Sequence, residues 1–210
     1  MIIGLTGGIG SGKSTVSRIL KDEYAIPIVD ADLISREVVK PGSDGIRQLK
    51  LKFGAQIIQQ DGKLDRTALR KMMAASQLVK DELDAVLHPL IQKEVLNQFS
   101  QLRNHGKSFI VYDCPLLFQT HQQRFTDKIM VVIAEREIRI QRIIARDHIS
   151  RELADKMIKL QMSESEMMAQ ADVVIDNNGD EHMLHRCVDV LMKKIGIKSK
   201  RSCFLFHKCL

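Results

Sequence analysis

A glycine-rich stretch near the start of the chain, "GGIGSGKST" at residues 7–15, directly follows the apolar run "MIIGLT". Glycine loses more backbone entropy on folding than any other residue, so such a cluster indicates close backbone approach or unusual dihedral angles. The spacing from Gly7 to Gly12, Lys13 and Ser14 fits the pattern G-x-x-x-x-G-K-[ST] of phosphate-binding loops. The stretch therefore predicts a buried strand, a phosphate-binding loop and a helix in succession.

Short apolar runs rich in β-branched residues alternate with longer segments of helical period along the rest of the chain. Strands that alternate with helices predict an α/β fold, in which helices cover both faces of a parallel sheet. We expect five strands, at residues 2–6, 26–30, 109–113, 129–133 and 173–176.

Two of the intervals between these strands are much longer than a single crossover helix requires. We therefore expect a core built from residues 1–30, 109–134 and 172–192, with helical insertions at residues 31–108 and 135–171. Residues 193–210 form a basic C-terminal extension. Two helical insertions on one nucleotide-binding sheet are typical of a protein that closes over two substrates.

Local patterns give more detailed expectations for the helices. Ser163 and Glu166 have the spacing of a capping box, and Pro89 suits the first position of a helix that continues through Leu90 and Ile91. Two apolar stripes at helical spacing are expected to be buried, namely Val16, Ile19 and Leu20 in one helix and Ile46, Leu49 and Phe53 in another.

The net charge of +6 comes entirely from the extension, because residues 193–210 hold six Lys or Arg and no acid. The remaining residues are neutral overall, and only 4% of the chain is aromatic, with no Trp. Neither feature favours a nucleic-acid-binding surface. No apolar run reaches the roughly 18–20 residues that a membrane helix needs. We expect no nucleic-acid or membrane partner, and a monomer or small homo-oligomer.

The four cysteines, Cys114, Cys187, Cys203 and Cys209, show no C-x-x-C spacing. This arrangement predicts free thiols in a reducing compartment, not a disulfide framework or a zinc site. The N-terminus has no basic region followed by an apolar run, as a secretory leader would have. Both observations predict a cytoplasmic protein.

The loop residues have distinct expected roles toward a bound nucleotide. Backbone N–H groups of Gly10, Ser11 and Gly12 and the positive end of the following helix form an anion cradle. Lys13 would reach the β- and γ-phosphates, and the Ser14 hydroxyl would coordinate Mg²⁺. Thr15 would donate to the α-phosphate. A GTPase also needs a D-x-x-G motif and an N/T-K-x-D motif. The chain lacks N/T-K-x-D, and "DNNG" at residues 176–179 matches D-x-x-G only by chance.

Acidic residues follow the second and third strands. Asp30 and Asp32 in "VDADLISR" would lie on one face if the chain stays extended, and a carboxylate there can accept a proton from an attacking hydroxyl. Asp32 is the preferred base, with Asp30 in a structural or Mg²⁺-water role; alternatively, one of them only caps a helix that begins at Leu33. Arg36 would contact acceptor phosphates or simply face solvent. Asp113 has the Walker B position, which holds Mg²⁺ directly or through water.

The segment "REIRIQRIIARD" places Arg139, Arg142 and Arg146 on one stripe of a predicted helix. Such a stripe is either the solvated face of an amphipathic helix or a lid that brings guanidinium groups onto developing negative charge. The second interpretation is favoured for Arg142 and Arg146, and the two remain equally open for Arg139.

These motifs together resemble the dephospho-coenzyme A kinase family over about residues 2–192. The resemblance is carried by "LTGGIGSGKSTV", "VDADLISREVV", "DGKLDRTALR", "LHPLI", "PLLF", the two arginines of "RIIARD", and "ADVVIDNNG" in order. It implies a three-layer P-loop kinase fold with a five-stranded parallel sheet, a helical acceptor-binding insertion at residues 31–108 and a helical lid at 135–171. The implied reaction transfers the γ-phosphoryl group of ATP, with Mg²⁺, to the ribose 3′-hydroxyl of dephospho-coenzyme A.

The resemblance also assigns roles to residues. It implies an ATP loop at residues 10–15, Asp32 as base and Arg142 and Arg146 in the lid. Acceptor contacts would come from Thr6, Asp32, Arg36, Arg66 and His88. The chain departs from the family pattern at Gln119, where Glu is usual, and at Met167, where Lys or Arg is usual. We expect Met167→Lys to be neutral or helpful to nucleotide binding.

The residues alone predict a P-loop phosphotransferase acting on a small hydroxyl acceptor, and the resemblance supplies the acceptor. Two alternatives remain at this stage. One is a nucleoside or nucleotide kinase, and the other is a non-catalytic nucleotide-binding switch.

Overall fold

The computed structural model describes residues 1–197 and 199. The chain divides into two compact units, one formed by Met1–Val29 together with the chain from Gly106 onward, and the other by Asp30–His105. The strands are β1 (Ile2–Gly7), β2 (Ile28–Asp30), β3 (Ile110–Asp113), β4 (Lys128–Ile133) and β5 (Val173–Asp176). The helices are α1 (Lys13–Tyr24), α2 (Ala31–Glu37), α3 (Asp44–Phe53), α4 (Arg66–Ala75), α5 (Gln77–Asn104), α6 (Arg136–Asp147), α7 (Arg151–Lys159), α8 (Glu164–Met168) and α9 (Glu181–Lys194), with short 3₁₀ turns η1 (Ala55–Ile57) and η2 (Gln122–Phe125).

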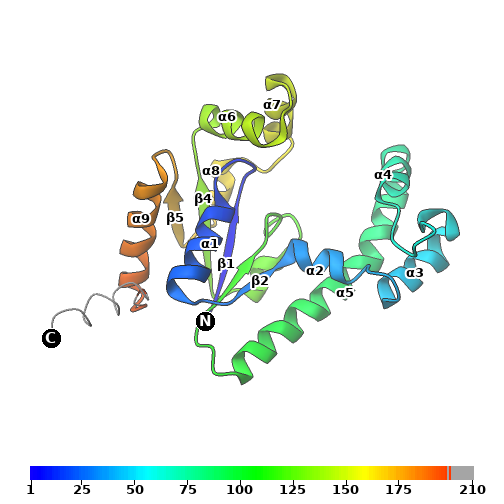
Figure 1. Ribbon diagram of the computed structural model, residues 1–210, viewed down its shortest axis with the longest axis horizontal. Helices are drawn as coiled ribbons and strands as arrows, with labels where there is room; N and C mark the ends of the chain where they lie inside the picture. Colours follow the sequence, from blue (N-terminus) through cyan, green and yellow to red (C-terminus); the bar gives the residue numbers. More distant parts are fainter. Residues whose placement is uncertain (198, 200–210) are drawn as a thin grey trace. The chain divides into compact units, whose positions relative to one another are not determined.

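The strands form one sheet in the order β2-β3-β1-β4-β5, with parallel pairing of β1 to β3, β1 to β4 and β4 to β5 (Figure 1). The prediction of five strands is confirmed, although β2 begins two residues later than expected. Pro27, just before β2, has no N–H to donate to a ladder; its carbonyl accepts from the Val111 N–H at 2.9 Å. Residues of β1 are buried throughout, as expected for the central strand.

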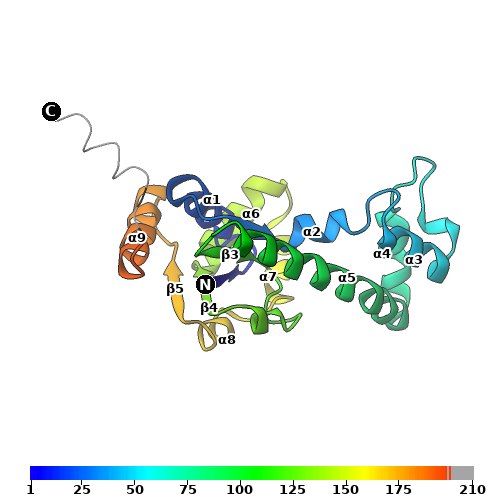
Figure 2. The same cartoon turned by 90° about the horizontal axis from the view of Figure 1, so that it is seen from below.

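The main core lies between the sheet and the helices α1 and α9, which contact each other. Successive side chains of β4 point to opposite faces of the sheet. Met130 and Val132 belong to this core, whereas Val131 lies on the opposite face. On that opposite side Val131 packs with Phe118 and Met167, and Figure 2 shows α8 beside β4. Helices therefore cover both faces, as predicted. The predicted stripe Val16, Ile19 and Leu20 is buried in the main core.

The second unit has its own apolar core, formed by α3, η1, α4 and the first part of α5. The predicted stripe Ile46, Leu49 and Phe53 is buried there. The expected helix start at Pro89 is wrong, because Pro89 lies well inside α5. The proline removes the hydrogen bond to the Ala85 carbonyl, but both residues are exposed, so water can solvate the freed group.

Other local predictions can be compared directly with the structure. The capping box is confirmed, since Ser163 accepts from the Glu166 N–H and the Glu166 carboxylate accepts from the Ser163 N–H at 2.9 Å. Residue 193, the expected start of the extension, falls within α9, and Ile195 and Ile197 pack against the main core. Residues 198 and 200–210, which include Cys203 and Cys209, lie outside the described residues.

Candidate active site

The phosphate-binding loop joins the central strand β1 to α1, which confirms the predicted strand, loop and helix. Gly12 is the N-cap of α1 with φ of 92°, and its carbonyl accepts from the Thr15 N–H at 3.0 Å. Lys13, Ser14 and Thr15 form the first helical turn, where N–H groups point out of the helix end. With no acid in this turn, the end of α1 can attract an anion.

Lys13 forms an ion pair with Asp113 at the carboxyl end of β3. The pairing register of the sheet explains this meeting, because Asp113 lies opposite Leu5 of β1, just before the loop. Both side chains are largely buried, at 17% exposed for Lys13 and 7% for Asp113. The two residues predicted for the phosphates and for Mg²⁺ are therefore in contact with each other.

Ser11 is fully buried in the middle of the loop. Its N–H donates to the Gly8 carbonyl at 3.0 Å, and its carbonyl accepts from the Asn177 Nδ2 at 2.7 Å. Its hydroxyl has no hydrogen-bond partner among the described residues. Buried hydroxyls without a partner are uncommon in folded proteins.

The three arginines of α6 differ in their surroundings. Arg142 is half-buried and donates to the Gly10 carbonyl at 3.3 Å, the Ser11 carbonyl at 3.4 Å and the Asn177 carbonyl at 2.9 Å. Arg146 is exposed and pairs with Asp147 at 2.7 Å, and this hydrogen bond raises the pKa of Arg146. Only Arg142 of the two predicted lid residues contacts the loop.

Arg139 is 4% exposed, so the solvated-face interpretation is wrong for this residue. Burial lowers the pKa of its guanidinium, and the nearby Glu164 carboxylate opposes that shift. The periodicity placed Arg139 correctly on the stripe with Arg142, but it could not indicate that other parts of the chain cover it.

Asn177 is a site residue that the sequence analysis missed. It follows β5, is buried, and contacts both Ser11 and Arg142 as described above. The "DNNG" string matches a GTPase motif only by chance, but its position at the carboxyl end of a parallel strand is a signal for a site residue, since ligands bind at those ends. Thr6, at the same edge, is buried and donates to the Pro115 carbonyl at 3.3 Å.

The expectation that Asp30 and Asp32 share one face of an extended chain is wrong. Asp30 ends β2 and caps α2, and its carboxylate accepts from the Asp32 N–H at 2.8 Å and the Leu33 N–H at 3.0 Å. The helix therefore begins at Ala31, two residues earlier than expected. Asp32 and Arg36 are both exposed and are separated by one helical turn, so they lie on one face of α2.

The remaining predicted acceptor residues also belong to the second unit. Arg66 is exposed at the start of α4, directly after Asp65, which caps that helix. His88 is exposed on α5, with its Nε2 3.8 Å from Asp84 Oδ1. Arg66 and His88 are thus available to solvent and have few constraints on their orientation.

The two departures from the family pattern have different environments. Gln119 is exposed, whereas Met167 is 3% exposed and packs with Phe118 and Val131. An ammonium group at that position would lose its hydration inside an apolar cluster. Met167→Lys is therefore expected to destabilise the fold, and its effect on nucleotide binding stays a prediction.

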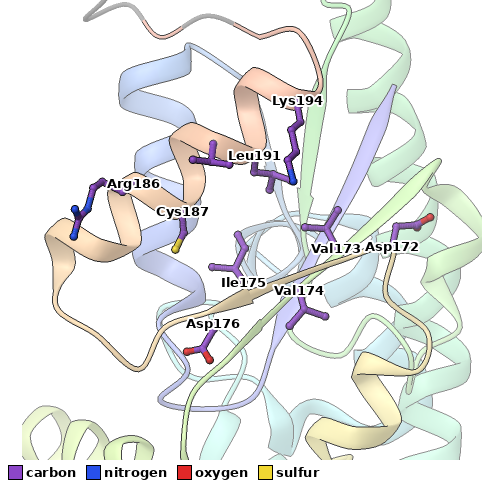
Figure 3. Close-up of a pocket in the computed structure, with 10 residues that line it drawn as sticks. Asp172, Val173, Val174, Ile175, Asp176, Arg186, Cys187, Leu191 and Lys194 are labelled. Atoms are coloured by element: carbon purple, nitrogen blue, oxygen red, sulfur yellow. The ribbon is translucent and has the colours of Figure 1, made fainter.

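A groove of about 630 Å³ lies between β5 and α9 (Figure 3). Val173, Ile175 and Leu191 contribute to its apolar wall, Asp172 and Lys194 lie toward one end, and Asp176 and Arg186 lie toward the other. None of the predicted site residues lines this groove, so it is separate from the phosphate-binding loop. Among residues 1–197 and 199, no helix has the length and apolar character required to cross a bilayer.

The residues present fit Mg²⁺ in the chemistry of their donors. Ser14 offers a hydroxyl oxygen and Asp113 a carboxylate oxygen, and both lie where β1, β3 and α1 meet. Mg²⁺ is held by few protein oxygens together with substrate phosphates and water. No group of three or more His, Cys, Asp or Glu side chains that could hold a metal ion is found among the described residues.

The central strand of the parallel sheet leads into a G-x-x-x-x-G-K-[ST] loop, and the lysine of this loop lies beside an acid on the neighbouring strand. These features define a P-loop nucleotide-binding protein. The sequence profile described as dephospho-CoA kinase matches residues 1–182. A dephospho-CoA kinase of Photobacterium profundum is 40% identical over 194 residues, which cover 92% of this chain and 95% of that protein. The chain belongs to the dephospho-CoA kinase family.

Solved structures agree with the fold. The crystal structure of TT1252 from Thermus thermophilus superposes with a TM-score of 0.80 at 29% identity, over 93% of this chain and 97% of that one. A dephospho-CoA kinase from Campylobacter jejuni gives a TM-score of 0.70 at 24% identity, over 92% of this chain and 96% of that one. The three-layer P-loop kinase fold is therefore confirmed.

Proposed function

We propose that this protein transfers the γ-phosphoryl group of ATP to the ribose 3′-hydroxyl of dephospho-coenzyme A, giving coenzyme A. The observation that carries the proposal is the loop with its Lys13–Asp113 pair, in a chain whose family match covers residues 1–182. The family supplies the reaction, and the loop supplies the chemistry that such a reaction needs.

ATP binds through the loop in this proposal. The N–H groups of residues 10–15 and the end of α1 surround the β-phosphate, and Thr15 lies by the α-phosphate. Lys13 places its charge on the β- and γ-phosphates when they replace Asp113 as its nearest anion.

Ser14 and Asp113 would hold Mg²⁺ in this proposal, with Asp113 binding it directly or through water. The ion would neutralise charge on the phosphate oxygens when bound. Asp113 is suited to that role, because its carboxylate ends a buried strand beside the loop and has little freedom to move. Lys13 and Asp113 place a positive and a negative charge side by side next to the loop.

Arg142 stabilises the transferred phosphoryl group in the transition state. Its guanidinium already lies against the loop carbonyls of Gly10 and Ser11, so a small movement of its side chain brings it to a phosphate. Arg146, which is exposed and paired with Asp147, acts only after the lid segment 135–171 closes. Arginine suits both positions because its planar donors match phosphate oxygens.

Asp32 is the base that takes the proton of the 3′-hydroxyl. Asp30 is occupied as a helix cap, which leaves Asp32, exposed on the first turn of α2, as the free carboxylate of the pair. Arg36 would bind acceptor phosphates on the same face, and Arg66, His88 and Thr6 complete the proposed acceptor contacts. Residues 31–108 form the acceptor-binding segment in this scheme.

The setting is proposed to be cytoplasmic. Cys187 is an exposed free thiol, as expected in a reducing compartment.

A coupled assay that measures ADP release with a panel of acceptors tests the proposal. We expect turnover with dephospho-coenzyme A and none with nucleosides or nucleoside monophosphates. Turnover with one of those acceptors in its place would support a nucleoside or nucleotide kinase. ATP binding without turnover on any acceptor would support a non-catalytic switch.

A further inference from the structure

Ile9 of the phosphate-binding loop contacts the segment 135–171 through its N–H, its carbonyl and its side chain. Its N–H donates to Gln161 Oε1 at 2.8 Å, and its carbonyl accepts from Arg139 Nε at 2.8 Å. Its side chain packs against an apolar cluster of α6 and α7 that includes Ile140 and Ile143. Both backbone groups and the side chain of this residue are thus committed to one distant segment of the chain.

The contacts on Ile9 belong to a small polar network. Arg139 also donates to Glu164 Oε1 at 3.0 Å and to Gln161 Oε1 at 3.3 Å. Gln161 follows α7 and Glu164 begins α8, so side chains from three parts of the segment meet at Arg139, and two of them, Arg139 and Gln161, contact Ile9. A buried guanidinium is costly unless its donors are paired, and each nitrogen of Arg139 has a partner here.

The glycines beside Ile9 fit this contact. A Cβ on Gly8 would overlap the Arg139 guanidinium, and a Cβ on Gly10 would lie 2.8 Å from the Arg139 carbonyl oxygen. Gly10 also has φ of 78°, which side-chain-bearing residues rarely adopt. The first half of the glycine-rich loop is therefore shaped by α6 as well as by the needs of a ligand.

Phosphate stabilisation by backbone donors depends on donors that are already in place when the ligand arrives. Ile9 directly precedes Gly10, the first residue of the proposed phosphate cradle. Fixing Ile9 therefore fixes the direction from which the chain enters the cradle. Movement of the segment 135–171 would be transmitted to the loop through the same contacts.

We propose that Arg139 and Gln161 are positioning residues that hold Ile9 and so preorganise the phosphate-binding loop, coupling its shape to the segment 135–171. The proposal rests on the proposed function, because it assumes that the loop binds ATP. Neither residue touches the substrate in this scheme; both act through Ile9.

A matched pair of variants at Gln161 tests the proposal, because this half-buried side chain can be changed with little risk to the fold. Gln161→Glu keeps an oxygen acceptor for the Ile9 N–H and Arg139, whereas Gln161→Leu removes it. Gln170→Leu, an exposed glutamine near α8, is the control. Arg139→Lys is a second test variant. Lysine keeps the positive charge but cannot reproduce the three hydrogen bonds that Arg139 donates to Ile9, Gln161 and Glu164.

The readouts are hydrogen exchange of the loop amides without nucleotide, the Kd for ATP by calorimetry without acceptor, and steady-state kinetics. We expect Gln161→Leu to speed exchange of the Ile9 amide by about two- to tenfold, the change that follows from removing one net hydrogen bond, and to weaken ATP binding about as much. The KM for dephospho-coenzyme A should stay unchanged. Gln161→Glu and Gln170→Leu should behave like the unmodified protein, and Arg139→Lys should resemble Gln161→Leu.

Wild-type exchange and ATP affinity in a folded Gln161→Leu protein would overturn the proposal. Faster exchange with unchanged ATP affinity would also overturn it, because the contact would then be structural only. If the unmodified protein bound no ATP, the proposed function would fail, and the exchange data would still report separately whether Gln161 holds Ile9.

Discussion

Arg142 Nη2 donates to the Asn177 carbonyl at 2.9 Å, which ties α6 to the turn that follows β5. Asn177 in turn donates to the Ser11 carbonyl at 2.7 Å, so the loop, α6 and the end of β5 form one connected group. The arginine is thus held close to the phosphate-binding loop by neutral carbonyl oxygens. It has no carboxylate partner among its described hydrogen bonds, so its charge is available to a phosphate.

This arrangement predicts the effect of Arg142→Ala. We expect kcat and kcat/KM for ATP to fall together by about a hundredfold or more, because the contact is made mainly in the transition state. Arg136→Ala, an exposed residue of the same helix that pairs with Asp155, is the control and should change neither constant. A fall in neither constant for Arg142→Ala would show that its charge plays no part in transfer.

Lys13→Ala removes the charge at the phosphates but leaves the backbone of the loop. We expect turnover to fall by at least about a hundredfold. The melting temperature should drop by only a few degrees, through the loss of the ion pair with Asp113. Lys21→Ala, an exposed lysine of the same helix, should be neutral in both measurements. Near-normal turnover in Lys13→Ala would remove the phosphate-loop interpretation.

Asp32→Asn keeps the shape of the side chain but cannot accept a proton. We expect kcat to fall by about a hundred- to ten-thousandfold, the usual contribution of a general base, with the Kd for ATP little changed. Asp30→Asn should cost less, because asparagine also caps helices well. The reverse order of effects would transfer the base to Asp30 and leave the kinase assignment intact.

Met167→Lys should destabilise the protein, since Met167 is buried against Phe118 and Val131. Placing an ammonium group there costs on the order of 2–4 kcal/mol, which lowers the melting temperature by several degrees. Met167→Leu conserves volume and should be tolerated. A melting temperature for Met167→Lys equal to that of Met167→Leu would show that the side chain reaches solvent.

The sequence predicted the strands and the loop well because those features depend on local pattern. Apolar runs identified the strands almost to the residue, and the glycine spacing identified the loop that precedes α1. Pro89 was misplaced because a long helix can accommodate a proline on an exposed turn, and no local pattern reveals the helix on its other side.

The site was less predictable where its residues meet only through the fold. The contact of Lys13 with Asp113 follows from the pairing of β1 with β3, which the spacing alone does not specify. Arg139 has the same helical periodicity as Arg146, yet one is buried and the other exposed, because only Arg139 faces Gln161 and Glu164. Asn177 was missed because its contacts with Ser11 and Arg142 also arise only through the fold.

The position of phosphorylation tests the central claim most directly. The purified protein is incubated with ATP, Mg²⁺ and either the 2′-deoxy or the 3′-deoxy analogue of dephospho-coenzyme A, and the products are analysed by mass spectrometry and ³¹P NMR. We predict that the 2′-deoxy analogue gains one phosphoryl group on its 3′-oxygen and that the 3′-deoxy analogue gains none. Phosphorylation of the 3′-deoxy analogue would contradict the account. A complete lack of phosphorylation, on both analogues and on dephospho-coenzyme A itself, would also contradict it.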